Sequence, residues 1–270
     1  MSSTGTLCYS LFMPDEIVNQ SLITKGLNTR FIGQNVLYYP ITTSTNDIAW
    51  QQALVKCPEG TAVIAEKQTS GRGRLKREWA TPQGNIAVSV VLYPTRKNLP
   101  FLTMLAALAV QYGIQKTTGL KCQLKWPNDV LINGKKVCGI LLESQATANS
   151  VDYAIIGIGI NVNMKLADYP EISAIATSLA DETGKDVSRV FLLQNLFVEM
   201  EKLYLRLQAG ESLLTEWREH LVTLGRSIHV RSGDEVFEGI AEAVAEDGSL
   251  MLRCTDGRLI KFTAGDVTLR

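Results

Sequence analysis

Basic side chains and glycines alternate in one short stretch of this chain, between residues 71 and 79, where the sequence reads GRGRLKREW. Glycine lets a backbone approach a ligand closely and adopt positive φ. An arginine guanidinium is a planar fork that donates two hydrogen bonds to a carboxylate or a phosphate. Four cations lie within the six residues from Arg72 to Arg77. The stretch therefore predicts a loop that binds an anion with several charges.

Two other interpretations of this loop stay open from composition alone. A basic loop exposed to solvent, or one that contacts nucleic acid, has the same residues. Trp79, at the end of the stretch, favours a ligand, because an indole can cover an aromatic base. An indole that is buried for packing alone is the competing explanation.

A second polar cluster lies at residues 125–129, which read KWPND. Pro127 favours an extended conformation at Trp126 and ends its strand. Asn128 and Asp129 then occupy a turn, where such side chains are common for local reasons. Lys125 has no local reason to lie in an otherwise apolar strand. We therefore expect its ammonium group to have a partner in a pocket.

Several familiar active-site motifs are missing or incomplete. Residues 157–162 read GIGINV and begin like a dinucleotide fingerprint, but Val162 stands at the third glycine position and no helix is predicted to follow directly. The chain has no G-x-x-x-x-G-K-[ST] phosphate loop and no G-x-S-x-G nucleophile elbow. Its two histidines, His220 and His229, lie outside any motif. This disfavours histidine-centred catalysis and a histidine metal site.

The composition is that of an ordinary globular protein. The 270 residues are 46% hydrophobic and 20% charged, with 27 basic and 27 acidic side chains, so no global charge indicates a nucleic-acid binder. The five cysteines are widely spaced and never form C-x-x-C, which argues against a disulfide framework and a cysteine zinc site. We expect a reduced, cytoplasmic chain with no secretory signal and no membrane span.

Hydrophobic periodicity predicts the elements that position these motifs. Strands are expected at residues 36–40, 61–66, 86–92, 123–126, 130–132, 137–143 and 153–161, and helices at 44–55, 100–117, 188–209 and 211–222. Ser44 is the expected N-cap of the first helix, with Asp47 at its third position. Residues 67–84 form a long polar loop, and Asn133-Gly134 predicts a tight hairpin.

The last part of the chain changes character. From Arg226 onward, short alternating strands are separated by Gly-Asp or Asp-Gly pairs at residues 233, 247 and 256, a spacing that suits a small barrel. Mixed strands and helices followed by a strand-only tail predict an α+β fold with a β cap. We therefore divide the chain into an N-terminal arm at 1–35, a main domain at 36–223 and a small β-barrel at 224–270.

Five ordered motifs resemble those of the biotin protein ligase family. The family shows G-R-G-R-x-x-R-x-W, K-W-P-N-D, G-K-K-x-x-G-I-L and G-x-G-x-N-x-N, which lie here at residues 71–79, 125–129, 134–141 and 157–163, and an S-T-N matches at 44–46. The resemblance spans roughly residues 36–270. It implies a mixed-sheet catalytic domain of the biotin/lipoate ligase type, followed by an SH3-like β-barrel. Residues 1–35 are short for a helix-turn-helix domain, so the resemblance is to the monofunctional type that lacks an N-terminal DNA-binding domain.

The resemblance implies a reaction in two steps. Biotin and ATP would give biotinyl-5'-AMP and pyrophosphate. A lysine of a biotin carboxyl carrier protein, of acetyl-CoA carboxylase or a related carboxylase, would then accept the biotinyl group. Both small substrates are anions, so cations and Mg²⁺ must offset their repulsion. A loop that orders on binding would shield the mixed anhydride from water.

Family roles carry over to this sequence by position. The residues implied for biotin are Ser44, Thr45, Asn46, Gln68, Arg72, Gly73, Arg74 and Lys136. Those implied for ATP and the adenylate are Arg74, Arg77, Trp79, Lys125, Asn128, Asp129 and Asn161. Among these, Lys125 and Arg74 are the expected catalytic residues, and Lys125 is expected to contribute most by stabilising charge near the carboxylate and the α-phosphate. No metal ligand is expected among the side chains.

Two departures from the family pattern lie in the loop. The family often has glycine where Lys76 stands and a basic residue where Glu78 stands, so loop flexibility and retention of the adenylate are open to variation. A homodimer is compatible with the family, whereas binding to DNA or to a membrane is not expected. The alternatives are a lipoate or octanoate ligase or transferase, which would lack the G-R-G-R motif, and a ligand-sensing transcriptional regulator, which the neutral net charge disfavours.

Overall fold

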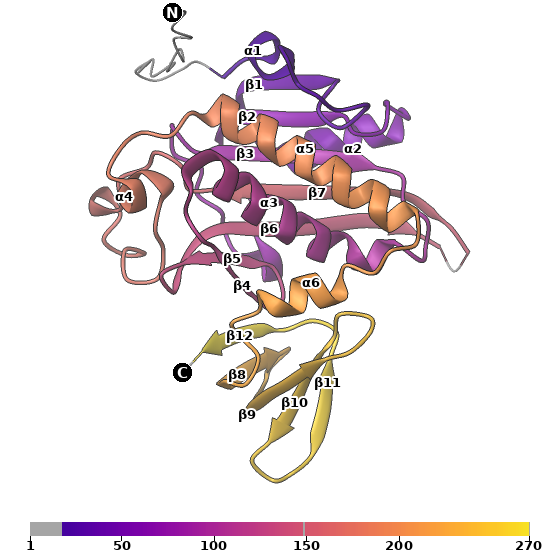
Figure 1. Ribbon diagram of the computed structural model, residues 1–270, viewed down its shortest axis with the longest axis vertical. Helices are drawn as coiled ribbons and strands as arrows, with labels where there is room; N and C mark the ends of the chain where they lie inside the picture. Colours follow the sequence, from indigo (N-terminus) through magenta and orange to yellow (C-terminus); the bar gives the residue numbers. More distant parts are fainter. Residues whose placement is uncertain (1–17, 148, 270) are drawn as a thin grey trace, which may run out of the picture.

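A seven-stranded mixed sheet forms the main part of the computed structural model, which describes residues 18–147 and 149–269. The strands run in the order β1-β2-β3-β7-β6-β5-β4 (Figure 1). Their bounds are β1 Val36–Thr42, β2 Ala62–Gln68, β3 Ile86–Leu92, β4 Gln123–Lys125, β5 Asp129–Ile132, β6 Lys135–Ala146 and β7 Val151–Ile160. β1 and β2 pair in parallel, and the other neighbours pair antiparallel.

The connections follow from the pairing. The parallel strands β1 and β2 are joined by α2 (Thr45–Leu54), because parallel neighbours need a crossover rather than a tight turn. β5 turns directly into β6 at Asn133-Gly134, where both residues have positive φ, 51° and 79°. Such a pair is the signature of a two-residue hairpin turn. The predicted hairpin is therefore confirmed.

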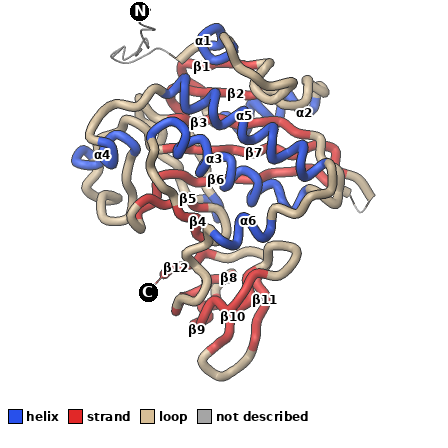
Figure 2. The backbone as a smooth tube through the Cα atoms, viewed as in Figure 1, coloured by secondary structure: helices blue, strands red, loops and turns tan. Residues whose placement is uncertain are grey.

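Helices cover the two faces of the sheet unequally. α3 (Leu102–Thr118) and α5 (Arg189–Gln208) lie against one face (Figure 2), where Ala62 and Ile64 of β2 join the main core. The intervening Val63 packs instead in a smaller cluster with Ala49 and Ala53 of α2. Because side chains alternate across a strand, α2 lies on the opposite face.

The C-terminal part of the chain forms a separate antiparallel sheet of five strands, in the order β11-β10-β9-β8-β12. The bounds are β8 Ser227–Ser232, β9 Glu235–Val244, β10 Leu250–Cys254, β11 Leu259–Phe262 and β12 Asp266–Leu269. Gly233, Gly248 and Gly257 have positive φ at its turns, as the turn pairs in the sequence predict. The α+β class, with a small all-β unit after a mixed sheet, is confirmed.

Trp126 of the KWPND segment joins the two sheets. Its indole Nε1 donates to the carbonyl of Gly248 at 3.0 Å, and its backbone N–H donates to Thr223 Oγ1 at 2.9 Å. The side chain is buried in the main core. One motif residue therefore holds the C-terminal sheet against the edge of the sheet that carries the polar clusters.

Residues 18–35 pack into the main core, whereas the sequence predicted an arm over residues 1–35; residues 1–17 lie outside the described part of the chain. Val18 and Ile23 are buried in that core, and α1 (Gln20–Thr24) packs against α5. The buried carboxylate of Glu201 on α5 accepts the backbone N–H groups of residues 30, 31 and 32 at 2.6, 2.8 and 3.0 Å. Backbone donors leave no pattern in a sequence, so this anchor was not predictable.

Two short elements between β7 and α5 were also missed, and one helix is shorter than predicted. The missed elements are the 3-10 turn Leu166–Asp168 and α4 (Leu179–Thr183), which are too short to show a helical period. α6 spans Leu214–Glu219 rather than residues 211–222. Among the described helices, none combines the length and the apolar character needed to cross a membrane.

We predict that Glu201→Ala lowers the free energy of unfolding by about 3 kcal/mol, because three backbone donors lose their buried acceptor. Chemical denaturation measures this difference. Glu211→Ala is the control, since Glu211 is exposed on the surface, and we expect it to change the free energy by less than about 1 kcal/mol. A loss as small as the control's in Glu201→Ala would show that this segment is not anchored by the carboxylate.

Candidate active site

A cavity of about 290 Å³ opens on the sheet face that carries α2. It is lined by α2, by the loop after β2, by strands β5 to β7 and by the segment that follows β7. The predicted site residues that line it are Ser44, Thr45, Asn46, Gln68, Arg72, Gly73, Arg74, Arg77, Trp79, Asn128, Asp129, Lys136 and Asn161. The structure thus brings residues from five separate motifs to one place, and their roles stay predictions.

Lys125 is the predicted site residue that does not line this cavity. Its ammonium Nζ lies 4.0 Å from Asp129 Oδ2, and its side chain is 21% exposed. Lys136 lies closer to the same carboxylate, with Nζ 2.6 Å from Asp129 Oδ1. The expected partner of Lys125 is therefore present, but Lys136 is the ammonium group that reaches the cavity wall.

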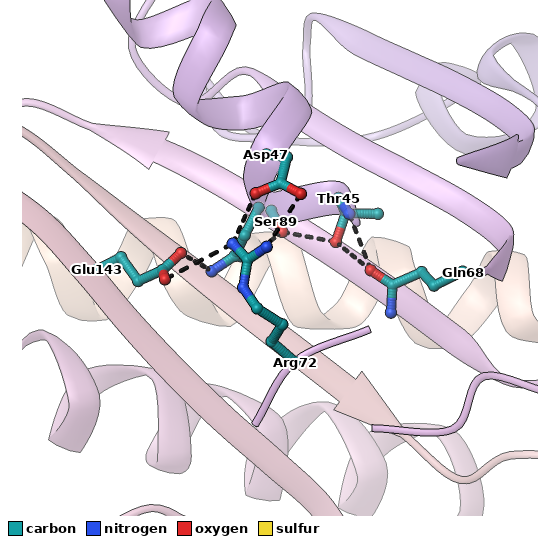
Figure 3. Close-up of polar contacts among 7 residues, drawn as sticks. Thr45, Asp47, Gln68, Arg72, Ser89 and Glu143 are labelled. Atoms are coloured by element: carbon teal, nitrogen blue, oxygen red, sulfur yellow. Dashed lines mark hydrogen bonds and ion pairs between the residues drawn. The ribbon is translucent and has the colours of Figure 1, made fainter. Parts of the chain in front are cut away.

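The start of α2 supplies a polar corner of the cavity. Thr45 donates its backbone N–H to Gln68 Oε1 at 2.8 Å, and Gln68 Nε2 donates to Thr81 Oγ1 at 2.9 Å. The buried hydroxyl of Ser89 lies 2.7 Å from Thr45 Oγ1 (Figure 3). It also lies 2.6 Å from Asn46 Oδ1. These contacts fix the side-chain orientations of Thr45, Asn46 and Gln68 before any ligand binds.

Ser44 is the N-cap residue of α2, as predicted, but its side chain makes no capping hydrogen bond. Asp47, expected at the third helical position for capping, instead binds the arginine loop. Its Oδ1 and Oδ2 accept from the two terminal nitrogens of Arg72 at 2.6 and 3.0 Å. Glu143 Oε1 lies 3.8 Å from the same guanidinium, so Arg72 lies between two carboxylates (Figure 3). The hydrogen bond to Asp47 raises the pKa of Arg72.

Arg74 is half-buried, and its Nη1 donates to Asn128 Oδ1 at 3.0 Å. Burial lowers the pKa of Arg74, because a low-dielectric surrounding disfavours the charged form, and the nearby charges of Asp129 and Asp266 act in the opposite direction. A half-buried cation whose hydrogen-bond partner is a neutral amide interacts strongly with an incoming anion.

Asp266 at the start of β12 brings the C-terminal sheet into the site. It lines the cavity and forms an ion pair with Arg77. Partial burial opposes ionisation of Asp266, but the hydrogen bond from Arg77, with the charges of Arg77, Lys125 and Arg74, holds the pKa of Asp266 below its ordinary value. The cationic loop is thus tied to the body of the protein at both ends.

The glycines of GIGIN make room for site residues. A Cβ atom at Gly157 would lie 2.3 Å from Asn46 Oδ1, and one at Gly159 would lie 2.3 Å from the Trp79 indole. Both distances are far below a van der Waals contact. The motif that resembled an incomplete dinucleotide fingerprint is therefore part of a strand whose glycines allow the side chains of Asn46 and Trp79 to pack directly on its backbone.

The glycines of the arginine loop do not have the positive φ that the sequence suggested. Gly73 has φ −105°, and the left-handed residue of this loop is Leu75, with φ 55°. Gly71 is required for a different reason, because a Cβ there would lie 2.3 Å from the carbonyl oxygen of Trp79. Close approach to the Trp79 carbonyl, not backbone handedness, therefore explains the glycine at position 71.

Trp79 forms one wall of the cavity. Its indole packs against Gly159 and Gly139, and Lys136 Nζ lies 5.4 Å from the centre of the ring, a favourable cation–π distance. The sequence left open whether Trp79 is buried for packing or offers a surface to a ligand. The geometry allows both roles. The indole is packed on one side and faces the cavity on another.

Sequence reasoning missed an apolar wall that follows β7. Met164, Ile172, Ile175 and Ala176 line the cavity, although Ile175 is 68% exposed. The backbone N–H of Lys136 donates to the carbonyl of Ile175, and the carbonyl of Lys136 accepts from the N–H of Thr177, each at 2.9 Å. The segment has no helical or strand period, so no sequence signal marked it. Among the described residues, no group of three or more His, Cys, Asp or Glu side chains is placed to hold a metal ion.

We predict that Gly159→Ala displaces Trp79, lowers the free energy of unfolding by about 1–3 kcal/mol, and shifts tryptophan emission to longer wavelength as the indole becomes more hydrated. Gly73→Ala is the matched control, because its added Cβ meets no atom closer than 3.6 Å and we expect unchanged emission. Equal spectra for the two variants would contradict the packing of Trp79 on this strand.

Comparisons with known proteins relate this chain to biotin protein ligases, as its cavity and motifs suggest. The model of the biotin/lipoate A/B protein ligase family matches residues 38–161, and the model of the biotin protein ligase C-terminal domain matches residues 223–270. The bifunctional ligase/repressor BirA of Bacillus subtilis is 37% identical over 267 residues, which are 97% of this chain and 82% of the relative. The biotin–[acetyl-CoA-carboxylase] ligase of Paracoccus denitrificans is 36% identical over 234 residues, 81% of this chain and 94% of the relative.

A solved structure extends the likeness to the fold. The biotin protein ligase from Aquifex aeolicus in complex with biotin and ATP superimposes with a TM-score of 0.73 at 28% identity, covering 88% of this chain and 99% of the other. The sequence match to a relative above 30% identity, over nearly the whole chain, agrees with the family models at both ends of the sequence. The chain belongs to the biotin protein ligase family.

Proposed function

We propose that this chain, as a biotin protein ligase, uses the cavity at the arginine loop for both steps of its reaction. In the first step, the carboxylate of biotin attacks the α-phosphorus of ATP and gives biotinyl-5'-AMP and pyrophosphate. In the second step, the amine of a lysine on a carrier protein attacks the acyl carbon and releases AMP. The observation that carries the proposal is the convergence of Arg72, Arg74, Arg77 and Lys136 on one cavity.

The polar corner at the start of α2 suits the ring system of biotin. A ureido ring presents N–H donors and a carbonyl acceptor, and the pre-oriented groups of Thr45, Asn46 and Gln68 offer partners of both kinds. The residues assigned to biotin remain Ser44, Thr45, Asn46, Gln68, Arg72, Gly73, Arg74 and Lys136. All eight line the same cavity, which supports this assignment.

The cations and the indole of the same cavity suit Mg-ATP and the adenylate. Burial around Arg74 strengthens its attraction for a carboxylate and a phosphate. The Trp79 indole offers a flat surface for an aromatic base. Mg²⁺ enters with the nucleotide as part of the substrate, because this ion keeps several waters and binds substrate phosphates with few protein ligands. The residues assigned here are Arg74, Arg77, Trp79, Lys125, Asn128, Asp129 and Asn161.

The carrier proposed for the second step is the biotin-bearing protein of acetyl-CoA carboxylase or a related carboxylase. Ligases acting on acetyl-CoA carboxylase among the relatives support it. We further propose that residues 36–223 hold both small substrates and that residues 224–270 contribute Asp266 to the site. The homodimer, the cytoplasmic location and the absence of DNA binding stay predictions.

The direct test supplies biotin, Mg-ATP and an isolated carrier domain. We predict a single biotinyl addition on one lysine of the carrier, detected by mass spectrometry, with release of pyrophosphate. Lipoate in place of biotin should give no addition, because the proposed polar corner matches a ureido ring rather than a dithiolane. Modification by lipoate, or an unmodified carrier in the presence of biotin, would contradict the proposal.

Substitution of Lys125 tests whether this residue takes part in the chemical step of adenylation. We predict that Lys125→Ala slows adenylation by about 10²-fold, the usual cost of removing one group that stabilises developing charge, without loss of the fold. Pyrophosphate release at saturating biotin and ATP gives the rate. Lys121→Ala, an exposed lysine just before the same strand, should keep the wild-type rate. Activity of Lys125→Ala within a few-fold of the control would remove Lys125 from the chemical step.

A further inference from the structure

The arginine loop is a closed unit that contacts the sheet through a few side chains. Its two arms are joined by backbone hydrogen bonds, from Trp79 N–H to Gly71 carbonyl at 2.9 Å and from Gly73 N–H to Arg77 carbonyl at 2.7 Å. A unit closed in this way moves as one piece. Holding one of its side chains therefore restrains the whole loop over the cavity.

Arg72 is the point at which this unit meets α2. Its guanidinium donates two hydrogen bonds to Asp47, at 2.6 and 3.0 Å, the paired geometry that gives an arginine–carboxylate contact its directionality. Glu143 lies 3.8 Å away on the other side and is itself held by Asn46 Nδ2 at 2.7 Å. Figure 3 shows the guanidinium between the two carboxylates.

We propose that Asp47 is a positioning residue, which acts through Arg72 to latch the arginine loop over the cavity and so retains biotinyl-5'-AMP until the carrier arrives. This inference rests on the proposed function. Asp47 does not touch the reacting atoms in this account. Its carboxylate instead determines how often the loop opens after the adenylate has formed.

Repulsion among the cations of the loop explains why an ion pair between Arg72 and Asp47 is needed at this position. Arg74, Arg77 and Lys136 line the same cavity as Arg72, and like charges in one place repel each other. Carboxylates offset this repulsion for each of the outer cations, Asp47 for Arg72 and Asp266 for Arg77. Removing the charge of Asp47 leaves Arg72 with the more distant Glu143, so Arg72 loses its nearest ion pair and its direct link to α2.

The expected effect is moderate because the pair is partly exposed, with side-chain exposures of 41% for Arg72 and 37% for Asp47. A well-oriented pair at such a site corresponds to about a fivefold change in an equilibrium. We therefore expect Asp47→Asn to release the adenylate about five times faster than the wild type. Asp47→Glu, which keeps the carboxylate, should restore most of the retention.

The experiment forms labelled adenylate from biotin and Mg-ATP on the full chain, removes free substrates, and follows the label that stays with the protein over time. Glu242→Gln is the matched control, because Glu242 and Arg253 form a similar fork, at 2.8 and 3.0 Å, in the C-terminal sheet. It should release adenylate at the wild-type rate. Pyrophosphate release at saturating biotin should stay within about twofold of wild type in Asp47→Asn, because a surface ion pair of this size does not determine the fold.

A double-mutant cycle separates this role from the alternatives. If Asp47 acts through Arg72, then Asp47→Asn/Arg72→Gln releases adenylate no faster than Arg72→Gln alone. The inference is overturned if Asp47→Asn retains adenylate as well as wild type, if its effect adds fully to that of Arg72→Gln, or if it slows adenylation in proportion. A wild-type protein that forms no adenylate at all would instead refute the proposed function.

Discussion

Electrostatic repulsion among the cations of the loop is the constraint on which the site depends. The protein gathers three guanidinium groups and an ammonium group around one cavity, at a place where two anionic substrates are to be joined. Before any anion binds, these groups need partners within the protein, and Asp47, Asp266 and Asp129 provide them for Arg72, Arg77 and Lys136. Arg74, which is half-buried, has a neutral amide as its hydrogen-bond partner. It is therefore the guanidinium best prepared to receive a substrate anion.

The sheet makes room for these groups because it has glycines at the positions where site residues approach its backbone. Glycines at 157 and 159 let Asn46 and Trp79 lie directly on β7, so the loop and the start of α2 come within reach of each other. The two sheets then contribute from opposite ends, since Trp126 fastens the C-terminal sheet and Asp266 extends from it to Arg77. A small all-β unit thereby supplies one charge to a cavity built by the larger sheet.

Much of this arrangement was predictable from the sequence, for identifiable reasons. Strands such as Ile86–Leu92 and the hairpin at Asn133-Gly134 have local signals in apolar runs and turn residues. The cavity residues were found because motifs with unusual chemistry, such as GRGRLKREW, stand out against an ordinary composition. The partners of these residues were not predictable in the same way. Asp47 and Arg72 are 25 residues apart in the chain, and Arg77 and Asp266 are 189 apart.

The segment after β7 and the N-terminal residues from 18 onward illustrate the same limit. Their positions are fixed by backbone contacts, with Lys136 in one case and with the Glu201 carboxylate in the other. Such contacts can be made by any residue type. Lys125 shows the converse. An unusual residue in an apolar strand predicted a partner in a pocket, and the Asp129 carboxylate lies 4.0 Å from its ammonium group, but Lys125 does not line the cavity.

We propose that these cations bind both substrates in one cavity. A crystal structure of the protein with biotin and a non-hydrolysable ATP analogue with Mg²⁺ tests it most directly. We expect Arg74 and Lys136 to turn from Asn128 and Asp129 to the biotin carboxylate and the phosphate oxygens, at hydrogen-bond distances of about 3 Å. Ligands bound elsewhere on the protein, with these side chains still on their present partners or directed into solvent, would contradict it.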